Sequence, residues 1–244
     1  MTTCPHCGRE LKTVSRHIGT QQFLVDELCD CGGAIQEREG RRVAERNRAK
    51  LSAASGAVKR SGMPDRFWSI PRDDAGLAAL EEAGFSMYLY GSVGTGKTYR
   101  ACAVAKAWAL KHTTTYGGGE YFAKPFRFRS VPSLLQDLRN CFDGHGNQAA
   151  LTGDLINARL LILDDMGQEA PTDWALDRIW DIIDQRWGRR RLTIVTSQCS
   201  PAQLAQHLAS RGKLKTAQSI VSRLCGDESE ILRFDGPDLR SSNS

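Results

Sequence analysis

The sequence of 244 residues predicts an α/β fold, with a central parallel sheet flanked by helices, and a small N-terminal metal-binding domain. Two observations predict the larger part. A glycine-rich stretch, GSVGTGKT, follows an apolar run, and a second apolar run, RLLILDDMG, closes with two aspartates. The smaller part is predicted by four cysteines that fall between Cys4 and Cys31. With 41% hydrophobic residues, a chain of this length can bury one full α/β core and still carry an appendage.

The first element along the chain is the cysteine-rich segment, which contains CPHCG and CDCGG. Paired thiolates on glycine-bearing turns are typical of a zinc site in a chain that keeps its cysteines reduced. Because the second pair is spaced C-x-C, His6 or His17 remains a possible replacement for one thiolate, and unliganded or redox-active cysteines remain the alternative. A segment of about 30 residues builds little core, so a bound metal would also stabilise it. The predicted Zn²⁺ ligands are Cys4, Cys7, Cys29 and Cys31.

The second element is a basic segment between Ile35 and Arg60, which holds eight Lys and Arg residues against three Glu. Its Ala, Glu and Arg content predicts a helix, either a solvated linker or a surface that meets nucleic acid or an acidic partner. The formal charge of the whole chain is only +5. No run of about 18 apolar residues occurs, and the N-terminus lacks a charged-then-apolar signal. We therefore expect a soluble, cytoplasmic protein that has no membrane partner.

The third element is a phosphate-binding loop, because GSVGTGKT has the spacing G-x-x-x-x-G-K-[ST]. A glycine-rich turn can aim successive backbone N–H groups at phosphate oxygens, and the helix that follows adds the positive end of its dipole. A strand is predicted over residues 85–90, and helical spacing of apolar residues follows the loop. Lys97 would reach the β- and γ-phosphates of ATP, and Thr98 would bind Mg²⁺. The predicted nucleotide contacts are Gly91, Ser92, Val93, Gly94, Thr95, Gly96, Lys97 and Thr98.

Two further strands would carry polar residues to the same edge of the sheet. RLLILDDMG reads as a buried strand, because it is continuously apolar up to Asp164 and Asp165. Asp164 would hold Mg²⁺ through water, and Asp165 would orient or activate the attacking water. RLTIVTSQ is another β-rich segment, and it would bring three polar side chains beside the γ-phosphate: Thr196, Ser197 and Gln198.

Two patterns allow both a structural and a nucleic-acid-binding interpretation. In TDWALDRIWDIIDQRW, one helix face is marked by Ile179, Trp180, Ile183 and Trp187. We predict that its tryptophans belong to the core rather than to a base-stacking platform. In PFRFRS, phenylalanines alternate with arginines, a pattern that single-strand binding proteins also use. Period-two alternation is typical of a half-buried strand, which is the interpretation we favour.

Taken together, the motifs resemble those of AAA+ ATPases in the DnaC/DnaI helicase-loader family, which also contains the IstB transposition helpers. The resemblance covers about Met63 to Arg240 and includes GSVGTGKT, LLILDDMGQEAPTDWALDRIWDIIDQRW, TIVTSQ, SIVSRL and FDGPDLR. It implies that Arg223 acts in trans as an arginine finger and that Arg240 is a sensor-2-like residue. It also places Gln198 at the sensor-1 position, where the family commonly carries asparagine.

The resemblance implies a task as well as a fold. Such proteins use ATP to self-assemble on single-stranded DNA and to place a hexameric replicative helicase around it, and their N-terminal domain binds the helicase. An IstB-type transposition helper is the alternative, and a small-molecule kinase is a third hypothesis, disfavoured because no substrate lid is evident. A zinc-binding N-terminus looks more like the DnaI-type loaders. The expected domains are a zinc-binding domain over 1–36, a basic helical linker over 37–62 and an AAA+ ATPase domain over 63–244.

Overall fold

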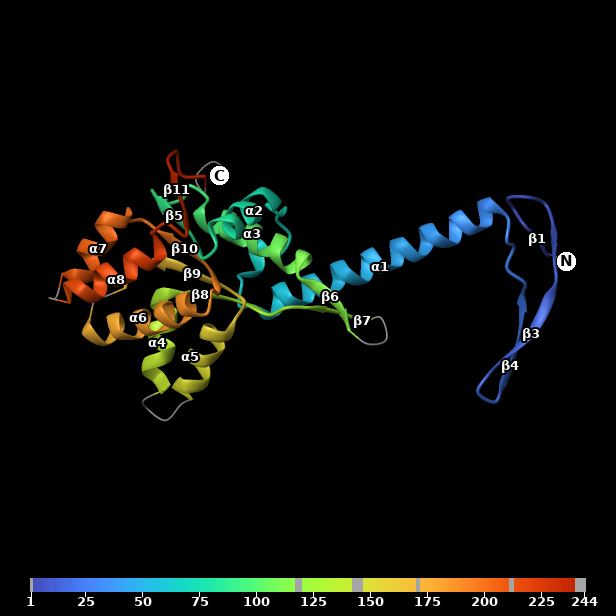
Figure 1. Ribbon diagram of the computed structural model, residues 1–244, viewed down its shortest axis with the longest axis horizontal. Coiled ribbons are helices and arrows are strands. Elements are labelled where there is room, and N and C mark those ends of the chain that lie inside the picture. The colour runs from blue at the N-terminus through green and yellow to red at the C-terminus, as the bar shows by residue number, and fades with distance from the viewer. Residues whose placement is uncertain (1, 117–119, 142–146, 170–171, 211–212, 240–244) are drawn as a thin grey trace. The chain divides into compact units, whose positions relative to one another are not determined.

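The structure is a computed structural model, and it describes residues 2–116, 120–141, 147–169, 172–210 and 213–239. The chain divides into two compact units, Met1–Leu51 and Ser52–Ser244 (Figure 1). The boundary falls within one continuous helix, α1 (Gly32–Arg60). Within the described ranges, no helix has the length and apolar character needed to cross a membrane.

The N-terminal unit consists of two small antiparallel ladders and the first part of α1. β1 (Thr2–Thr3) pairs with β2 (Glu10–Leu11), and β3 (Thr13–Ile18) pairs with β4 (Gln21–Asp26). Every residue of β4 is exposed. The buried hydrophobic cluster of this unit contains Cys4, Cys29 and Ala34. Hydrophobic burial therefore contributes little to the stability of this unit.

The C-terminal unit is built on a five-stranded sheet of order β11-β5-β10-β9-β8, and every neighbouring pair is parallel. This confirms the predicted parallel α/β fold. The acidic strand β9 lies between two others, as its continuous apolar run predicts. The edge strand β11 was not among the predicted strands. The strand bounds are Ser86–Gly91 for β5, Phe126–Ser130 for β8, Leu160–Met166 for β9, Leu192–Ser197 for β10 and Ser229–Phe234 for β11.

Helices cover both faces of the sheet (Figure 1). One hydrophobic cluster joins the sheet to the end of α1 and to α2 (Asp74–Ala83) and α3 (Lys97–Lys111). In β9, Ile162 belongs to that cluster and Leu163 to the cluster on the other face, so alternate residues serve opposite cores. The other face is covered by α4 (Val131–Asn140), α5 (Gln148–Asn157), α6 (Asp173–Gly188), α7 (Pro201–Ala209) and α8 (Leu214–Leu224). The remaining elements are a 3₁₀ turn, η1 (Asp65–Phe67), and a hairpin of β6 (Thr113–Tyr116) and β7 (Glu120–Ala123).

The prediction for the tryptophans of α6 was wrong. Ile179 and Ile183 are buried, but Trp180 is 36% exposed and Trp187 is 44% exposed. At 100° per residue, both tryptophans fall at the edge of the buried stripe rather than at its centre. The position at the end of the stripe is taken instead by Arg186, which is fully buried.

The structural interpretation of PFRFRS is supported by the burial of β8. Phe126 and Phe128 are buried in the sheet's hydrophobic core. On the opposite side, Arg127 donates from Nε to Asp154 Oδ2 at 2.5 Å and from Nη2 to Asp154 Oδ1 at 2.7 Å. The alternation therefore follows from one apolar face and one polar face of a strand, with Arg127 of the polar face paired to Asp154.

Candidate nucleotide-binding site and cysteine cluster

The phosphate-binding loop connects β5 to α3, and its glycines adopt conformations that other residues avoid. Gly91, Gly94 and Gly96 have φ angles of 136°, 77° and 93°. A Cβ atom at Gly91 would lie 2.0 Å from the backbone carbonyl oxygen of Phe234, so that position is closed to any side chain. The C-terminal segment is also joined to the loop by a hydrogen bond from Leu239 N to Gly94 O at 3.0 Å. All three glycines are favoured by their backbone angles, and Gly91 is also required by the close approach of another backbone segment.

Lys97 is the first residue of α3, and its ammonium group lies within the loop itself. Its Nζ donates to the carbonyl oxygen of Gly91 at 2.9 Å and to that of Ser92 at 2.6 Å. The side chain is buried, with 7% exposed. A lysine in this place supplies a compact positive charge on a flexible stem at the point where phosphate oxygens would approach.

Three side chains join the loop to the ends of β9 and β10. Thr98 Oγ1 donates to Asp164 Oδ1 at 2.8 Å, and Thr196 Oγ1 donates to the same oxygen at 2.6 Å. Burial raises the pKa of Asp164, and the hydroxyls of the two threonines act in the opposite direction. A threonine hydroxyl beside a strand-end aspartate is the pair of oxygen groups that P-loop enzymes use for Mg²⁺.

β9 runs into a tight turn that carries the second aspartate. Asp165 has a φ of 58°, an uncommon left-handed conformation for a residue with a side chain, and Gly167 has a φ of 91°. The backbone N–H of Asp165 donates to Thr196 Oγ1 at 3.0 Å. The turn thereby directs Asp164 toward Thr98 while Asp165 lines the neighbouring cavity.

A cavity of about 660 Å³ opens above the loop, and this is a size suited to a nucleotide. Five predicted site residues outside the glycines line it: Val93, Lys97, Thr98, Asp165 and Gln198. The prediction that Thr196 and Ser197 lie beside the γ-phosphate was wrong. Both are buried, because the hydroxyl of Thr196 binds Asp164 and the hydroxyl of Ser197 donates to Met166 O at 2.6 Å. Of these three polar residues, only Gln198, which directly follows β10, reaches the cavity.

Five lining residues were not predicted from the sequence: Arg66, Phe67, Tyr99, Gln168 and Leu239. Tyr99 directly follows GSVGTGKT, and Gln168 directly follows RLLILDDMG. Each would have been found if its motif had been extended by one residue. Arg66 and Phe67 come from η1, which precedes the sheet, and no spacing rule connects that turn to the loop.

The two predicted arginines lie elsewhere. Arg223 is in the last turn of α8 and does not line the cavity of its own chain. Its Nη2 lies 2.5 Å from Asp184 Oδ1, its Nη1 donates to Ser219 O at 3.2 Å, and its guanidinium is 5.3 Å from the ring centre of Trp187. Arg240 lies outside the described residues.

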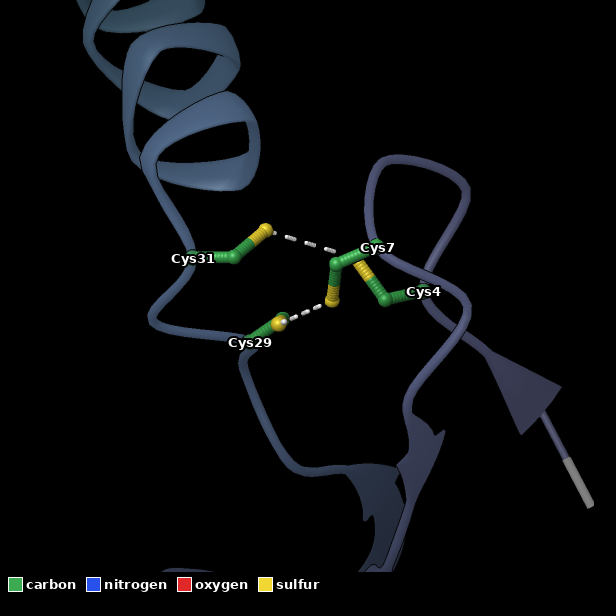
Figure 2. A group of neighbouring side chains, drawn as sticks. All are labelled: Cys4, Cys7, Cys29 and Cys31. Atoms are coloured by element: carbon green, nitrogen blue, oxygen red, sulfur yellow. Dashed lines mark hydrogen bonds between the residues drawn. The ribbon is translucent and has the colours of Figure 1, made fainter.

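The four N-terminal cysteines converge on one point, as Figure 2 shows. Their sulfur atoms all lie within 4.8 Å of one another, with 3.8 Å between those of Cys4 and Cys31 and 3.5 Å between those of Cys7 and Cys29. Four thiolates at about 2.3 Å from a tetrahedral Zn²⁺ would be separated by about 3.8 Å, so this donor set fits the ion. The backbone N–H of His6 is the largest cause that lowers the pKa of Cys4 to about 6. The pKa of Cys7 is lowered by the backbone N–H of Arg9 but raised overall to about 11 by Cys29, burial and the other thiols, so the first thiolate of the group is favoured at Cys4.

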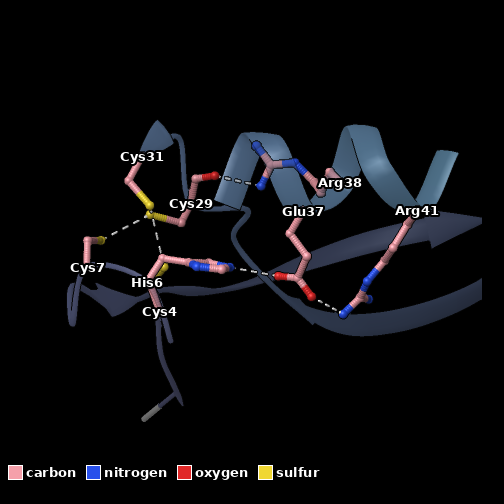
Figure 3. A network of polar contacts seen from close by, with 8 residues as sticks. All are labelled: Cys4, His6, Cys7, Cys29, Cys31, Glu37, Arg38 and Arg41. Atoms are coloured by element: carbon pink, nitrogen blue, oxygen red, sulfur yellow. Dashed lines mark hydrogen bonds and ion pairs between the residues drawn. The ribbon is translucent and has the colours of Figure 1, made fainter. Parts of the chain in front are cut away.

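Contacts around the cysteine cluster tie it to the start of α1 (Figure 3). His6 does not join the sulfurs, and its Nε2 lies 2.9 Å from Glu37 Oε2. The carboxylate of Glu37 also pairs with Arg41 one turn further along the helix. Arg38 Nη1 donates to the carbonyl oxygen of Cys29 at 2.6 Å. Contacts of this kind fix the backbone that carries metal ligands.

The sequence from residue 70 to residue 244 matches the family of IstB-like ATP-binding proteins. The chain belongs to this family. Membership confirms the resemblance drawn from the motifs, and it gives the chain an ATP-binding AAA+ domain around the cavity described above.

Individual relatives fall into two groups. The replicative helicase loader DnaI of Bacillus subtilis is 30% identical over 162 residues, which are 64% of this chain and 48% of that protein. A putative insertion-sequence ATP-binding protein of Mycobacterium tuberculosis is 31% identical over 168 residues, 67% of this chain and 60% of that protein. An insertion-sequence putative ATP-binding protein of Pseudomonas fluorescens is 33% identical over 158 residues, 63% of this chain and 62% of that protein. The chain thus spans about half to three fifths of the length of these relatives.

Solved structures agree on the fold. A crystal structure of DnaI aligns with a TM-score of 0.52 at 25% identity and covers 74% of this chain and 91% of that one. A crystal structure of the DnaC helicase loader aligns with a TM-score of 0.52 at 23% identity, over 70% of this chain and 100% of that one. At that identity, the DnaC comparison speaks for the fold alone.

Proposed function

We propose that this protein is an ATPase that assembles on single-stranded DNA and loads a hexameric replicative helicase there. The observation that carries the proposal is the meeting of three strand ends around one cavity, where Lys97, Thr98, Asp165 and Gln198 line the same space. Those groups supply the charge, the metal-binding hydroxyl and the water-orienting carboxylate that phosphoryl transfer from ATP requires.

Each residue has a distinct role in this proposal. Lys97 leaves its loop carbonyls to neutralise the β- and γ-phosphates, and Thr98 with Asp164 holds Mg²⁺. Asp165 orients the attacking water, and Gln198 contacts the γ-phosphate or that water. Arg223 acts on the nucleotide of a neighbouring subunit, an assignment supported by its place in SIVSRL and by its absence from the lining of its own cavity. Arg240 remains a predicted nucleotide contact.

The N-terminal unit would hold Zn²⁺ through its four cysteines and bind the helicase. Support for the loader comes from this cysteine cluster and from the relative named as a replicative helicase loader. A transposition helper is the second candidate, because the family itself and several relatives are named for insertion sequences. Both candidates share the ATPase and differ in the protein that they contact.

The ATPase is tested by two substitutions that separate binding from turnover. Lys97→Ala removes the phosphate contact and should abolish nucleotide binding. Asp165→Ala should leave ATP binding largely intact and remove hydrolysis, because that side chain acts on water. Binding of a fluorescent ATP analogue and steady-state phosphate release measure the two effects. Equal loss of binding in both variants would contradict the assignment.

Mixing of variants tests whether Arg223 acts across an interface. Arg223→Ala should retain ATP affinity yet lose most turnover, since arginine fingers contribute about 10³ to 10⁵ in rate. Mixed with Lys97→Ala subunits, it should regain part of the activity, because some interfaces then pair an intact loop with an intact finger. No recovery in a mixture shown to co-assemble would exclude action in trans.

The partner is tested with the full chain. We expect it to form a complex with the replicative helicase of its source organism on size-exclusion chromatography with ATP. Binding to single-stranded DNA should depend on ATP and weaken as salt rises, since phosphate contacts dominate such binding. A complex with a transposase of an insertion sequence from that organism, and none with the helicase, would establish the second candidate.

A further inference from the structure

The turn that follows β9 is pinned to its surroundings at four backbone groups. The N–H of Asp165 donates to Thr196 Oγ1 at 3.0 Å, and the carbonyl of Met166 accepts from Ser197 Oγ at 2.6 Å. The N–H of Gly167 donates to Glu169 Oε2 at 2.8 Å, and the carbonyl of Glu169 lies 3.1 Å from His207 Nε2. The ends of β10 and a side chain of α7 thus hold a turn that contains two left-handed residues.

Glu169 differs from the other three groups that pin the turn, because it belongs to the turn's own segment and carries a buried carboxyl group. Its side chain is only 5% exposed. One carboxyl oxygen accepts from Gly167, and the other, Oε1, is buried without a hydrogen-bond partner among the described residues. Burial without full hydrogen bonding is costly, and it raises the pKa of this carboxyl. Glu169 is therefore a poor stabiliser of the core but a well-placed acceptor for the turn.

The turn matters because of what it carries. Asp165 and Gln168 both line the cavity, and Gly167 lies between them. Gly167 has a φ of 91°, and its N–H donates to the carboxylate of Glu169. An acceptor on that N–H fixes the backbone between the two lining side chains. Loss of the acceptor would let the peptide rotate and displace both of them.

We propose that Glu169 is a positioning residue for ATP hydrolysis, which holds the Gly167 amide and thereby places Asp165 and Gln168 against the nucleotide. The inference rests on the proposed function, since it assigns Glu169 a part in the turnover of the same site. The inference concerns hydrolysis and not nucleotide binding. Lys97 and the loop glycines, which we expect to bind the phosphates, lie at the connection of β5 to α3, whereas Glu169 lies in the turn after β9.

The test compares Glu169→Met with Glu169→Gln. Methionine has a similar volume and no acceptor for the amide, so kcat should fall by about ten- to a hundredfold, a size typical of small misplacements. KM for ATP should change by less than about twofold, because the loop contacts remain. Glutamine keeps an oxygen for Gly167 and should retain most of the wild-type kcat. The thermal midpoint of the methionine variant should change little, since removal of a buried carboxyl with one unpartnered oxygen offsets the loss of the hydrogen bond from Gly167.

Glu81→Met is the matched control. Glu81 pairs with Lys111 and His112 outside the site, so its loss should leave kcat unchanged. An unchanged kcat in Glu169→Met, or equal losses in the methionine and glutamine variants, would overturn the inference. A fall in kcat accompanied by a matching fall in the thermal midpoint would also overturn it, because that is the signature of a purely structural role.

Amide hydrogen exchange separates this inference from the proposed function. The Gly167 amide should exchange faster in Glu169→Met than in wild type, and this readout needs no turnover. If wild type hydrolyses no ATP, the proposed function fails while exchange still decides whether Glu169 holds the turn. Unaltered exchange at Gly167 would refute the positioning role directly.

Discussion

The two units of this chain reach stability by different physical routes. In the described part of the N-terminal unit, the buried hydrophobic cluster is formed by Cys4, Cys29 and Ala34. The C-terminal unit has two extensive hydrophobic clusters, one on each face of its sheet. The strands differ in the same way, since every residue of β4 is exposed while the first five of β9 are buried.

The comparison shows that the length of a unit and the placement of its cysteines decide whether it is stabilised by a bound metal or by hydrophobic burial. Fifty residues with few apolar side chains bury little surface to offset the entropy of ordering, and the proposed Zn²⁺ would supply the difference. A five-stranded sheet between two layers of helices buries enough surface on its own. The units should therefore respond in opposite ways to metal removal and to deletion of apolar side chains.

The largest expected effect is loss of the metal. Structural Zn²⁺ sites contribute about 10 to 16 kcal/mol, so Cys29→Ser or a strong chelator should unfold the N-terminal unit completely. The thermal midpoint of the C-terminal unit should be unchanged, because the two hydrophobic clusters of that unit contain none of the four N-terminal cysteines. Metal analysis and calorimetry with resolved transitions measure both effects, and Cys141→Ser is the control. A folded N-terminal unit without bound metal would break the comparison.

The second effect concerns Arg186, the buried cation of the C-terminal unit. It donates to Thr193 Oγ1 at 3.1 Å and to three carbonyl oxygens, those of Leu155, Ala158 and Leu192. Burial lowers its pKa to about 9. Arg186→Met should destabilise this unit by about 3 to 5 kcal/mol, because these buried acceptors lose their donor. Chemical denaturation measures this loss of unfolding free energy, and Arg189→Met, at an exposed neighbouring position, is the control. A loss under about 1 kcal/mol in Arg186→Met would contradict a stabilising role for Arg186.

The third prediction makes the same substitution in both units. Leu138 of α4 is 0% exposed, so Leu138→Ala should lower the free energy of unfolding by about 2 to 5 kcal/mol. Leu24 of β4 is 75% exposed, so Leu24→Ala should change the stability of its unit very little. Denaturant unfolding of the two variants provides the measurement. A large loss in Leu24→Ala would mean that the hairpin has a core of its own.

The smallest effect is expected at Glu37, which links the cysteine cluster to α1. His6 and Arg41 lower its pKa, so its contribution is complete at neutral pH and is lost only as pH falls through the lowered value. Glu37→Gln should weaken zinc affinity slightly at pH 7, because both partners lose a charged acceptor. A competitive zinc chelator titration measures this, with the exposed Glu39→Gln as control. Equal affinities in all three proteins would show that the pair contributes nothing.

The sequence by itself determined the elements that depend on local spacing. The phosphate-binding loop and the acidic strand were readable because their chemistry needs fixed residue types at short separations. The cysteine pairs were readable for the same reason, and the four sulfurs do converge. Continuous apolar character also predicted that β9 lies inside a parallel sheet.

Only the tertiary structure decided which side chains reach the cavity and which are buried against other parts of the fold. Thr196 and Ser197 were expected at the phosphate and instead bind Asp164 and Met166. Trp180 and Trp187 lie at the edge of a helix stripe whose end is occupied by Arg186. Arg66 reaches the cavity from η1, far along the chain from the acidic strand, and Glu169 accepts from a turn whose backbone angles no motif specifies. Such placements depend on how neighbouring elements compete for a limited buried volume, and that competition is a property of the whole packed fold.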